Sequence, residues 1–162
     1  MAVLVIGQNV HIDRSKKFPV QKFVGSTWSI IEEDERSLAL SEIDLENVVL
    51  SRTLPLGKNS IRGYEKHEFL RATGCIRLDA NVFWTLWNDQ KAIPESWKEE
   101  MNGHPTFIYF DGTVLTDSTG ERFVLYLCYY GSQWCWGKRW LGHYWNIYKP
   151  SALLPRDYKK VA

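Results

Sequence analysis

The hydrophobic pattern in the second half of the chain predicts antiparallel strands. Phe107–Phe110 and Thr113–Thr116 are β-type runs that flank Asp111-Gly112. A type I′ hairpin turn favours this dipeptide because both of its central residues need a positive φ. The pattern therefore predicts a hairpin that turns at Asp111-Gly112.

A second pair of apolar runs predicts another hairpin. Phe123–Tyr130 and Gln133–Trp140 flank Gly131-Ser132, which suits a type II′ turn with glycine first. Asp117–Gly120 has the composition of a connecting turn. Together the two hairpins predict a C-terminal four-stranded antiparallel meander.

The middle of the chain has the signals of helices. Tyr64–Thr73 is rich in helix formers, and Gly74 is typical of the position after a helix C-terminus. Asp79 can cap a second helix, from Ala80 to about Gln90, in which Phe83 and Trp87 share an apolar stripe and should be buried against the sheet. A short third helix is expected at 95–98, after Pro94.

The N-terminal third is read mainly as β-structure. We expect a buried strand at Ala2–Ile6, a loop at Gln8–Lys17, strand–turn–strand at Val20–Ile31, an exposed acidic connection at Glu32–Glu35, and two strands within Ser37–Leu54, part of which also fits a helix. Strands, then helices, then strands indicate an α+β fold rather than alternating βαβ units. We expect a single domain over residues 1–155 and a basic, flexible tail over 156–162.

Composition supports a globular core and does not indicate a dedicated nucleic-acid binder. The 162 residues are 44% hydrophobic and 14% aromatic, and the net charge is only +1. The charge is uneven, because residues 32–46 carry seven acids and one base, whereas residues 138–162 carry six bases and one acid. The basic residues lie among aromatic ones and could hold a single-stranded nucleic acid, although a solvated surface is the favoured interpretation.

The sequence predicts a cytoplasmic protein with reduced thiols and no membrane contact. The N-terminal apolar run ends at Gly7, and Phe123–Tyr130 is far shorter than the ~20 residues of a membrane helix. Cys75, Cys128 and Cys135 are odd in number and lack metal-ligand spacing. We expect three free cysteines.

The predicted Gly131-Ser132 hairpin has two different sides. A two-residue loop pairs Tyr130 with Gln133 and Cys128 with Cys135. The side that contains Leu125, Leu127 and the tryptophans is the more apolar and should pack on the core. The other side is amphipathic, and exposed Tyr and Trp rings can bind flat ligands or partner side chains. The candidate binding residues are Tyr126, Tyr130, Gln133, Arg139, Tyr144 and Trp145.

Motifs for catalysis or cofactor binding are missing from the sequence. The chain has no G-x-S-x-G, P-loop, G-x-G-x-x-G or H-E-x-x-H pattern, so we assign no catalytic residue, cofactor or metal. The favoured function is a non-enzymatic binding or interaction module for a protein or a small molecule. Two alternatives are a small hydrolase-like enzyme that uses acids from residues 32–46 with a histidine, and a single-stranded nucleic-acid binder.

Several segments resemble a pattern in small hypothetical bacterial proteins with no known activity. The similar segments are Ile76–Ala80, Phe83–Trp87, Ile93–Lys98, Phe110–Leu115 and the tryptophan-rich hairpin. The resemblance covers roughly residues 61–145 and implies a shared domain without an assigned site. It would make Asp79 a helix cap and Asp111-Gly112 a hairpin turn.

Overall fold

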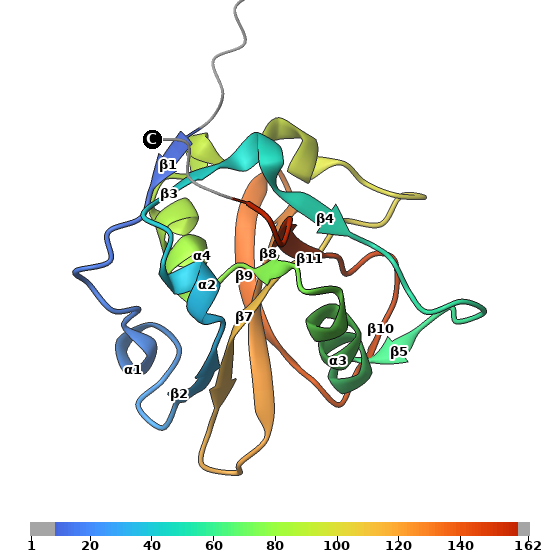
Figure 1. Ribbon diagram of the computed structural model, residues 1–162, viewed down its shortest axis with the longest axis horizontal. Coiled ribbons are helices and arrows are strands. Elements are labelled where there is room, and N and C mark those ends of the chain that lie inside the picture. Colours follow the sequence, from blue (N-terminus) through green and yellow to red (C-terminus); the bar gives the residue numbers. More distant parts are fainter. Residues whose placement is uncertain (1–8, 159–162) are drawn as a thin grey trace, which may run out of the picture.

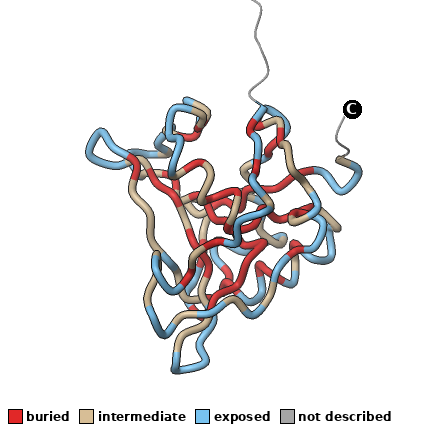
Figure 2. Tube along the Cα trace, turned by 90° about the vertical axis from the view of Figure 1, so that its left-hand side faces the viewer, coloured by how far each residue is buried: buried red, intermediate tan, exposed pale blue. Residues whose placement is uncertain are grey.

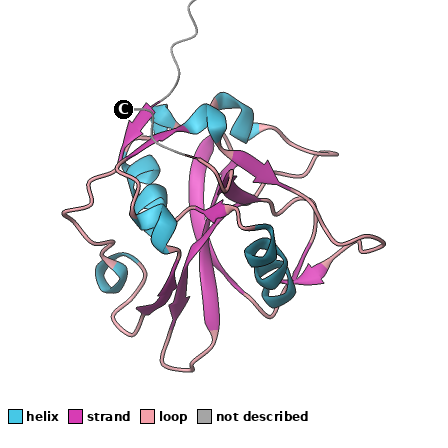
Figure 3. Cartoon of the chain, in the orientation of Figure 1, coloured by secondary structure: helices cyan, strands magenta, loops and turns pink. Residues whose placement is uncertain are grey.

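Strands dominate the computed structural model, which describes residues 9–158 (Figures 1 and 3). The strands are β1 (Asn9–His11), β2 (Ser29–Glu33), β3 (Glu42–Asp44), β4 (Val49–Ser51), β5 (Ile61–Arg62), β6 (Ile76–Arg77), β7 (Ile108–Thr116), β8 (Arg122–Tyr130), β9 (Gln133–Trp140), β10 (Tyr144–Trp145) and β11 (Ser151–Leu154). The helices are α1 (Val20–Phe23), α2 (Glu35–Leu38), α3 (Gly63–Thr73) and α4 (Ala80–Asn88), with 3-10 turns η1 (Leu45–Asn47), η2 (Gln90–Ala92) and η3 (Glu95–Lys98).

One large sheet organises the molecule. Its strand order is β4-β11-β7-β8-β9, with β2 also paired to β7 and β6 to β11. Only β11 and β7 run parallel among the described pairs, so the sheet is mostly antiparallel. Two further pairs, β1 with β3 and β10 with β5, lie outside it. The mixed fold with a large antiparallel sheet agrees with the predicted fold class.

The β8–β9 hairpin has the predicted register. Tyr130 pairs with Gln133 and Cys128 with Cys135, and the pairing continues to Phe123 and Trp140. The predicted type of turn is wrong, because Gly131 and Ser132 both have positive φ, at 61° and 64°. Positive φ at both central residues defines a type I′ turn rather than type II′.

The predicted hairpin at Asp111-Gly112 is wrong, and β7 runs straight through this dipeptide. The register between β7 and β8 shifts between Phe110 and Leu115, so the dipeptide lies in an irregular part of the strand. Gly112 donates its N–H to the carbonyl of Leu78 at 2.9 Å, and a Cβ there would clash with the backbone of Arg77. Glycine is needed for this close approach to β6. The meander therefore has three strands, β7, β8 and β9, instead of four.

The N-terminal third departs most from the sequence-based expectation. Val20–Phe23 is a helical turn instead of a strand, and Asn9–His11 is a strand within the predicted loop. The expected acidic connection is also wrong, because Glu32 and Glu33 belong to β2 and Asp34 is buried and caps α2. Of the two strands expected on either side of Glu42–Asn47, the second is confirmed in part by β4, whereas the first is wrong because Leu38 ends α2, and β3 lies in the expected connection. The strand predicted at Ala2–Ile6 lies outside the described residues.

The predicted C-terminus of α3 and the predicted N-terminal cap of α4 are confirmed. Gly74 follows α3 with a φ of 73°, and the Asp79 carboxylate accepts a hydrogen bond from the Asn81 N–H at 2.8 Å. Asp79 is fully buried and also accepts from Arg14 (2.9 Å) and Ser37 (2.5 Å), so the cap ties the N-terminal region to α4. The third predicted helix is the short 3-10 turn η3.

The chain continues beyond the predicted end of the domain without leaving its surface. Tyr158 packs against the core, and its hydroxyl accepts a hydrogen bond from the N–H of Asp44 at 3.1 Å. Of the tail expected from residue 156 onward, the structure therefore places Tyr158 beside β3, and residues 159–162 lie outside the described residues.

The sheet separates two hydrophobic clusters. Figure 1 shows α4 on one side of β7–β9 and α3 with β5 and β10 on the other, and Figure 2 shows the buried parts of the chain gathered in the interior. The larger cluster joins α4 to Phe110, Leu125 and Leu127, on the hairpin side that was predicted to pack on the core. The smaller cluster lies on the opposite side, around Tyr109 and Trp145.

Candidate functional site

The amphipathic side of the hairpin is built around Tyr126 and Arg139. Tyr126 pairs with Gly137 across the strands, and a Cβ at Gly137 would clash with the Tyr126 hydroxyl. The tyrosine ring therefore lies over the bare backbone of β9. Arg139 is held in place by donating from Nε to the hydroxyl of Tyr109 at 3.1 Å. Its guanidinium carbon lies 5.9 Å from the ring centres of both Tyr126 and Phe107, within the range of cation–π attraction.

The segment after β9 adds two aromatic residues with opposite roles. Trp145 is 1% exposed and stacks on Tyr109, with ring centres 4.3 Å apart and planes 18° apart. Its neighbour Tyr144 points the other way and is 56% exposed. The pairing of β10 with β5 places Arg62 opposite Tyr144, and the guanidinium lies 4.7 Å from the centre of the ring.

Lys149 lies between the Tyr126–Arg139 pair and the Arg62–Tyr144 pair. Its Nζ donates to the carbonyl of Tyr144 at 3.2 Å. Burial lowers the pKa of Lys149, and repulsion from Arg139 lowers it further by a smaller amount. Within residues 9–158, Arg62, Arg139 and Lys149 form no ion pair with a carboxylate. We call the surface formed by Arg62, Tyr126, Arg139, Tyr144 and Lys149 the cation–aromatic face.

A buried lysine lies beneath this face. Lys66 of α3 donates from Nζ to the carbonyl of Lys149 at 2.7 Å, and its ammonium is 5.6 Å from the centre of the Trp145 ring. Burial lowers the pKa of Lys66 to about 8, an effect that attraction to Asp111 only partly offsets. The cation–aromatic face therefore has positive charge both at its surface and below it.

The six predicted binding residues are divided between the face and its surroundings. Tyr126, Arg139 and Tyr144 lie on it, whereas Trp145 is buried underneath and supports Tyr109. Tyr130, which is 67% exposed, and Gln133 form the last pair before the turn, on the same side of the hairpin but further along the strands.

Sequence reasoning missed Arg62 and Lys149 as members of the site. Lys149 was visible only as one of the basic residues of the C-terminal part. Arg62 gave no local signal, because only the pairing of two-residue strands β5 and β10 brings it to Tyr144.

Two acids of residues 32–46, Glu32 and Asp34, form ion pairs with arginines. Glu32 lies 4.0 Å from His67, but Arg71, Arg77 and Arg122 also contact its carboxylate. Burial lowers the pKa of His67, which favours the neutral imidazole beside these guanidinium groups. Among the described residues, no group of three or more His, Cys, Asp or Glu could hold a metal ion.

The paired cysteines are free thiols in the structure. Cys128 and Cys135 face each other across the hairpin, and Cys75 lies apart from them, after α3. Burial, with a smaller contribution from Cys135, raises the pKa of Cys128 to about 11. Cys128 is thus a protonated, poorly reactive thiol at neutral pH.

Comparisons with known proteins add no family to this picture. No family model matches the chain, and no curated protein or solved structure matches it significantly. The resemblance to small bacterial proteins therefore stays a prediction. Within residues 9–158, none of the helices has the length and apolar character needed to cross a membrane.

Proposed function

We propose that this protein is a non-enzymatic binding module and that it binds single-stranded nucleic acid through the cation–aromatic face. The observation that carries the proposal is the grouping of Arg62, Arg139 and Lys149 around exposed or half-buried tyrosines, without a carboxylate partner among the described residues. Their hydrogen bonds go to neutral groups (the carbonyls of Gly142 and Tyr144 and the hydroxyl of Tyr109), so their charge stays available for phosphates, and tyrosine rings can stack on unpaired bases.

The arrangement of charges and rings favours a single strand over a duplex. Tyr144 is 56% exposed and lies under the Arg62 guanidinium, so an unpaired base can stack on a ring next to a cation. The bases of a duplex are already stacked and cannot use such a ring. The low net charge of +1 also argues against tight binding to duplex DNA at physiological salt.

Fluorescence anisotropy of a labelled oligo(dT) of about twelve nucleotides, a length suited to one stacking surface, tests the proposal. Between about 50 and 200 mM salt, three phosphate contacts give a slope of log affinity against log salt of about −2. Replacing Arg62, Arg139 and Lys149 together by Gln should flatten the slope by about that amount. Tyr144→Ala should lower the affinity about tenfold, because stacking contributes ~1–3 kcal/mol per base.

Matched controls distinguish the effect of charges on the cation–aromatic face from the effect of positive charge elsewhere on the protein. Lys17→Gln, Lys22→Gln and Lys91→Gln remove three exposed charges elsewhere and should leave the slope nearly unchanged. A duplex of the same length should bind at least about tenfold more weakly than the single strand. Equal salt slopes for the two triple variants would exclude the face as the binding surface, and the absence of salt-sensitive binding would exclude the ligand class.

A further inference from the structure

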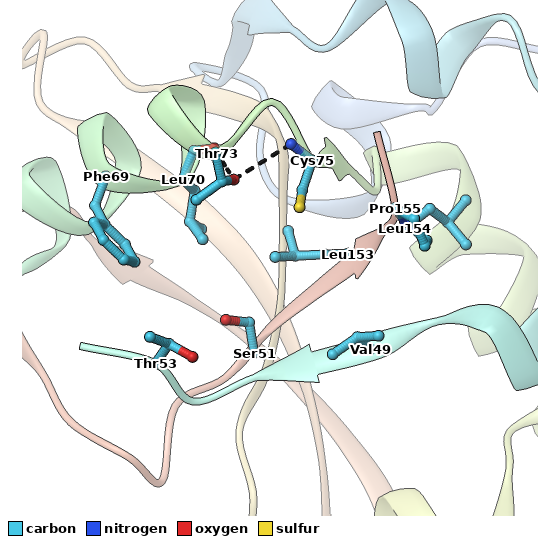
Figure 4. Close-up of a pocket in the computed structure, with 10 residues that line it drawn as sticks. All are labelled: Val49, Ser51, Thr53, Phe69, Leu70, Thr73, Cys75, Leu153, Leu154 and Pro155. Carbon is cyan, nitrogen blue, oxygen red and sulfur yellow. Dashed lines mark hydrogen bonds between the residues drawn. The ribbon is translucent and has the colours of Figure 1, made fainter. Parts of the chain in front are cut away.

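A separate, largely apolar cavity lies between the C-terminal half of α3 and the strands β4 and β11. Its volume is about 340 Å³, within the range of ~300–1,000 Å³ typical of small-molecule pockets. Figure 4 shows Phe69, Leu70 and Cys75 directed into it from the helix side, and Ser51 facing them from β4. Leu153 and Leu154 of β11 are buried and form part of its wall.

The inward side of α3 presents a mixture of large apolar and short or polar residues to this space. Positions 66, 69, 70 and 73 share one side of the helix. Leu70 is the fully buried aliphatic residue on that side, whereas the amine of Lys66 extends to Lys149 and Thr73 is short. Leu70 and the half-buried Phe69 leave part of the β4–β11 ladder uncovered, so a gap remains.

The chemistry of the wall defines the ligand. None of the described lining residues carries a charge, so an ion would lose its water without gaining a partner. The Thr73 hydroxyl is already bonded to the carbonyl of Leu70 at 2.6 Å. In contrast, the hydroxyls of Ser51 and Thr53 form no hydrogen bond within the described residues, and they can bind one polar group of a ligand.

We infer that this cavity binds an uncharged, mainly apolar small molecule that carries one hydroxyl or carbonyl group. The ring or alkyl part contacts Leu70, Leu153 and Leu154, and its polar group reaches Ser51 or Thr53. Cys75 lines the cavity and is half-exposed, so a bound ligand shields its sulfur from reagents in solution. This site is independent of the cation–aromatic face and needs no nucleic acid.

Alkylation of Cys75 by N-ethylmaleimide, followed by mass spectrometry, tests the inference with 2-naphthol as the probe. At about ten times its Kd, 2-naphthol should slow the reaction of Cys75 about tenfold, because only the free protein reacts. Cys135 is also half-exposed but lies on β9, so its rate should stay unchanged and serves as the internal control. Naphthalene-2-sulfonate, which has the same rings and a charge, should give little protection.

Two variants locate the protection. Thr53→Phe fills the mouth of the cavity and should abolish the effect of 2-naphthol, whereas Thr27→Phe, at an exposed threonine remote from the cavity, should preserve it. The inference is overturned if 2-naphthol leaves the Cys75 rate unchanged up to its solubility limit, or slows Cys135 equally. Equal protection by the sulfonate would overturn the uncharged ligand class, and protection that survives in Thr53→Phe would place the ligand elsewhere.

Discussion

The two longest helices lie on opposite sides of the same sheet and bury opposite kinds of side chain. α4 buries Val82, Phe83 and Leu86, whereas α3 buries Lys66 and His67 with Leu70 (Figure 1). The α4 side is consequently a conventional apolar core. The α3 side is filled incompletely, keeps positive charge next to aromatic rings, and contains both proposed binding sites.

We infer from this difference that the α4 side contributes most of the stability of the molecule, whereas the α3 side carries its proposed function. An apolar side chain on the α4 side contributes to folding through burial and close packing. A buried amine on the α3 side gives up hydration and is held by carbonyl groups and a ring, which contributes little to stability. We therefore expect large folding effects on the α4 side and small ones on the cation–aromatic face.

The largest effect is expected at the centre of the α4 side. Phe83 is fully buried and contacts Phe110 edge-on, so Phe83→Ala should lower the free energy of unfolding by ~3–5 kcal/mol. Trp87 was expected to lie equally deep but is only half-buried, and Trp87→Ala should cost less. Equilibrium denaturation measures both, and a loss below about 1 kcal/mol for Phe83→Ala would contradict the assignment of the core.

The next effect is a pH dependence that comes from Lys66. Its pKa is about 8 in the folded protein and 10.5 in the unfolded chain, so between these values the unfolded chain binds more protons. Raising the pH from 8 to 9.5 should therefore increase the free energy of unfolding of the wild type, relative to Lys66→Met, by about 1.5 kcal/mol. Urea denaturation at both pH values checks this, and a difference independent of pH would mean that the amine is not buried.

A smaller effect tests the contact between Tyr126 and Gly137. Gly137→Ala places a methyl group against the tyrosine hydroxyl and should destabilise the protein by about 1 kcal/mol. In a Tyr126→Ala background the same change should be neutral or slightly stabilising, because alanine is otherwise better than glycine within a strand. Additive effects in this double-mutant cycle would show that the ring does not lie over β9.

The smallest effect is expected at the exposed tyrosine. Tyr144→Ala should change the free energy of unfolding by less than about 0.5 kcal/mol, since more than half of the residue is exposed and its ring lies against the exposed Arg62 guanidinium. Thermal unfolding provides the check. A larger loss would make Tyr144 a structural residue, and its effect on oligo(dT) binding would then lose its meaning.

The sequence predicted correctly those features that depend only on residues close together in the chain. The loop length at Gly131-Ser132 determines the register of β8 and β9, and Asp79 caps a helix that begins at the next residue. Asp111-Gly112 had an equally strong local signal, but the hairpin turn predicted from it was wrong. Its glycine is needed for contact with β6, more than thirty residues earlier in the chain. The sequence did not predict α1, because Val20 and Phe23 are typical strand residues. Both pack against the larger core cluster, whose residues are distant in the sequence.

The candidate sites show the same limit. Tyr126 and Arg139 could be placed on one side of a hairpin from the register alone. Arg62 and Lys149 could not, because β5–β10 pairing and the course of the chain after β10 bring them there. The cavity beside Cys75 could not be predicted either, since it depends on how α3, β4 and β11 pack together.

A two-dimensional NMR titration of the ¹⁵N-labelled protein with unlabelled oligo(dT) tests the central claim most directly. The backbone amide signals of Arg62, Tyr126, Arg139, Tyr144 and Lys149 should shift together as the oligonucleotide is added, and the shifts should disappear at high salt. The signals of α4, on the opposite side of the sheet, should stay in place. Shifts that concentrate on α4, or a spectrum that does not change, would contradict the assignment of the cation–aromatic face as the ligand-binding surface.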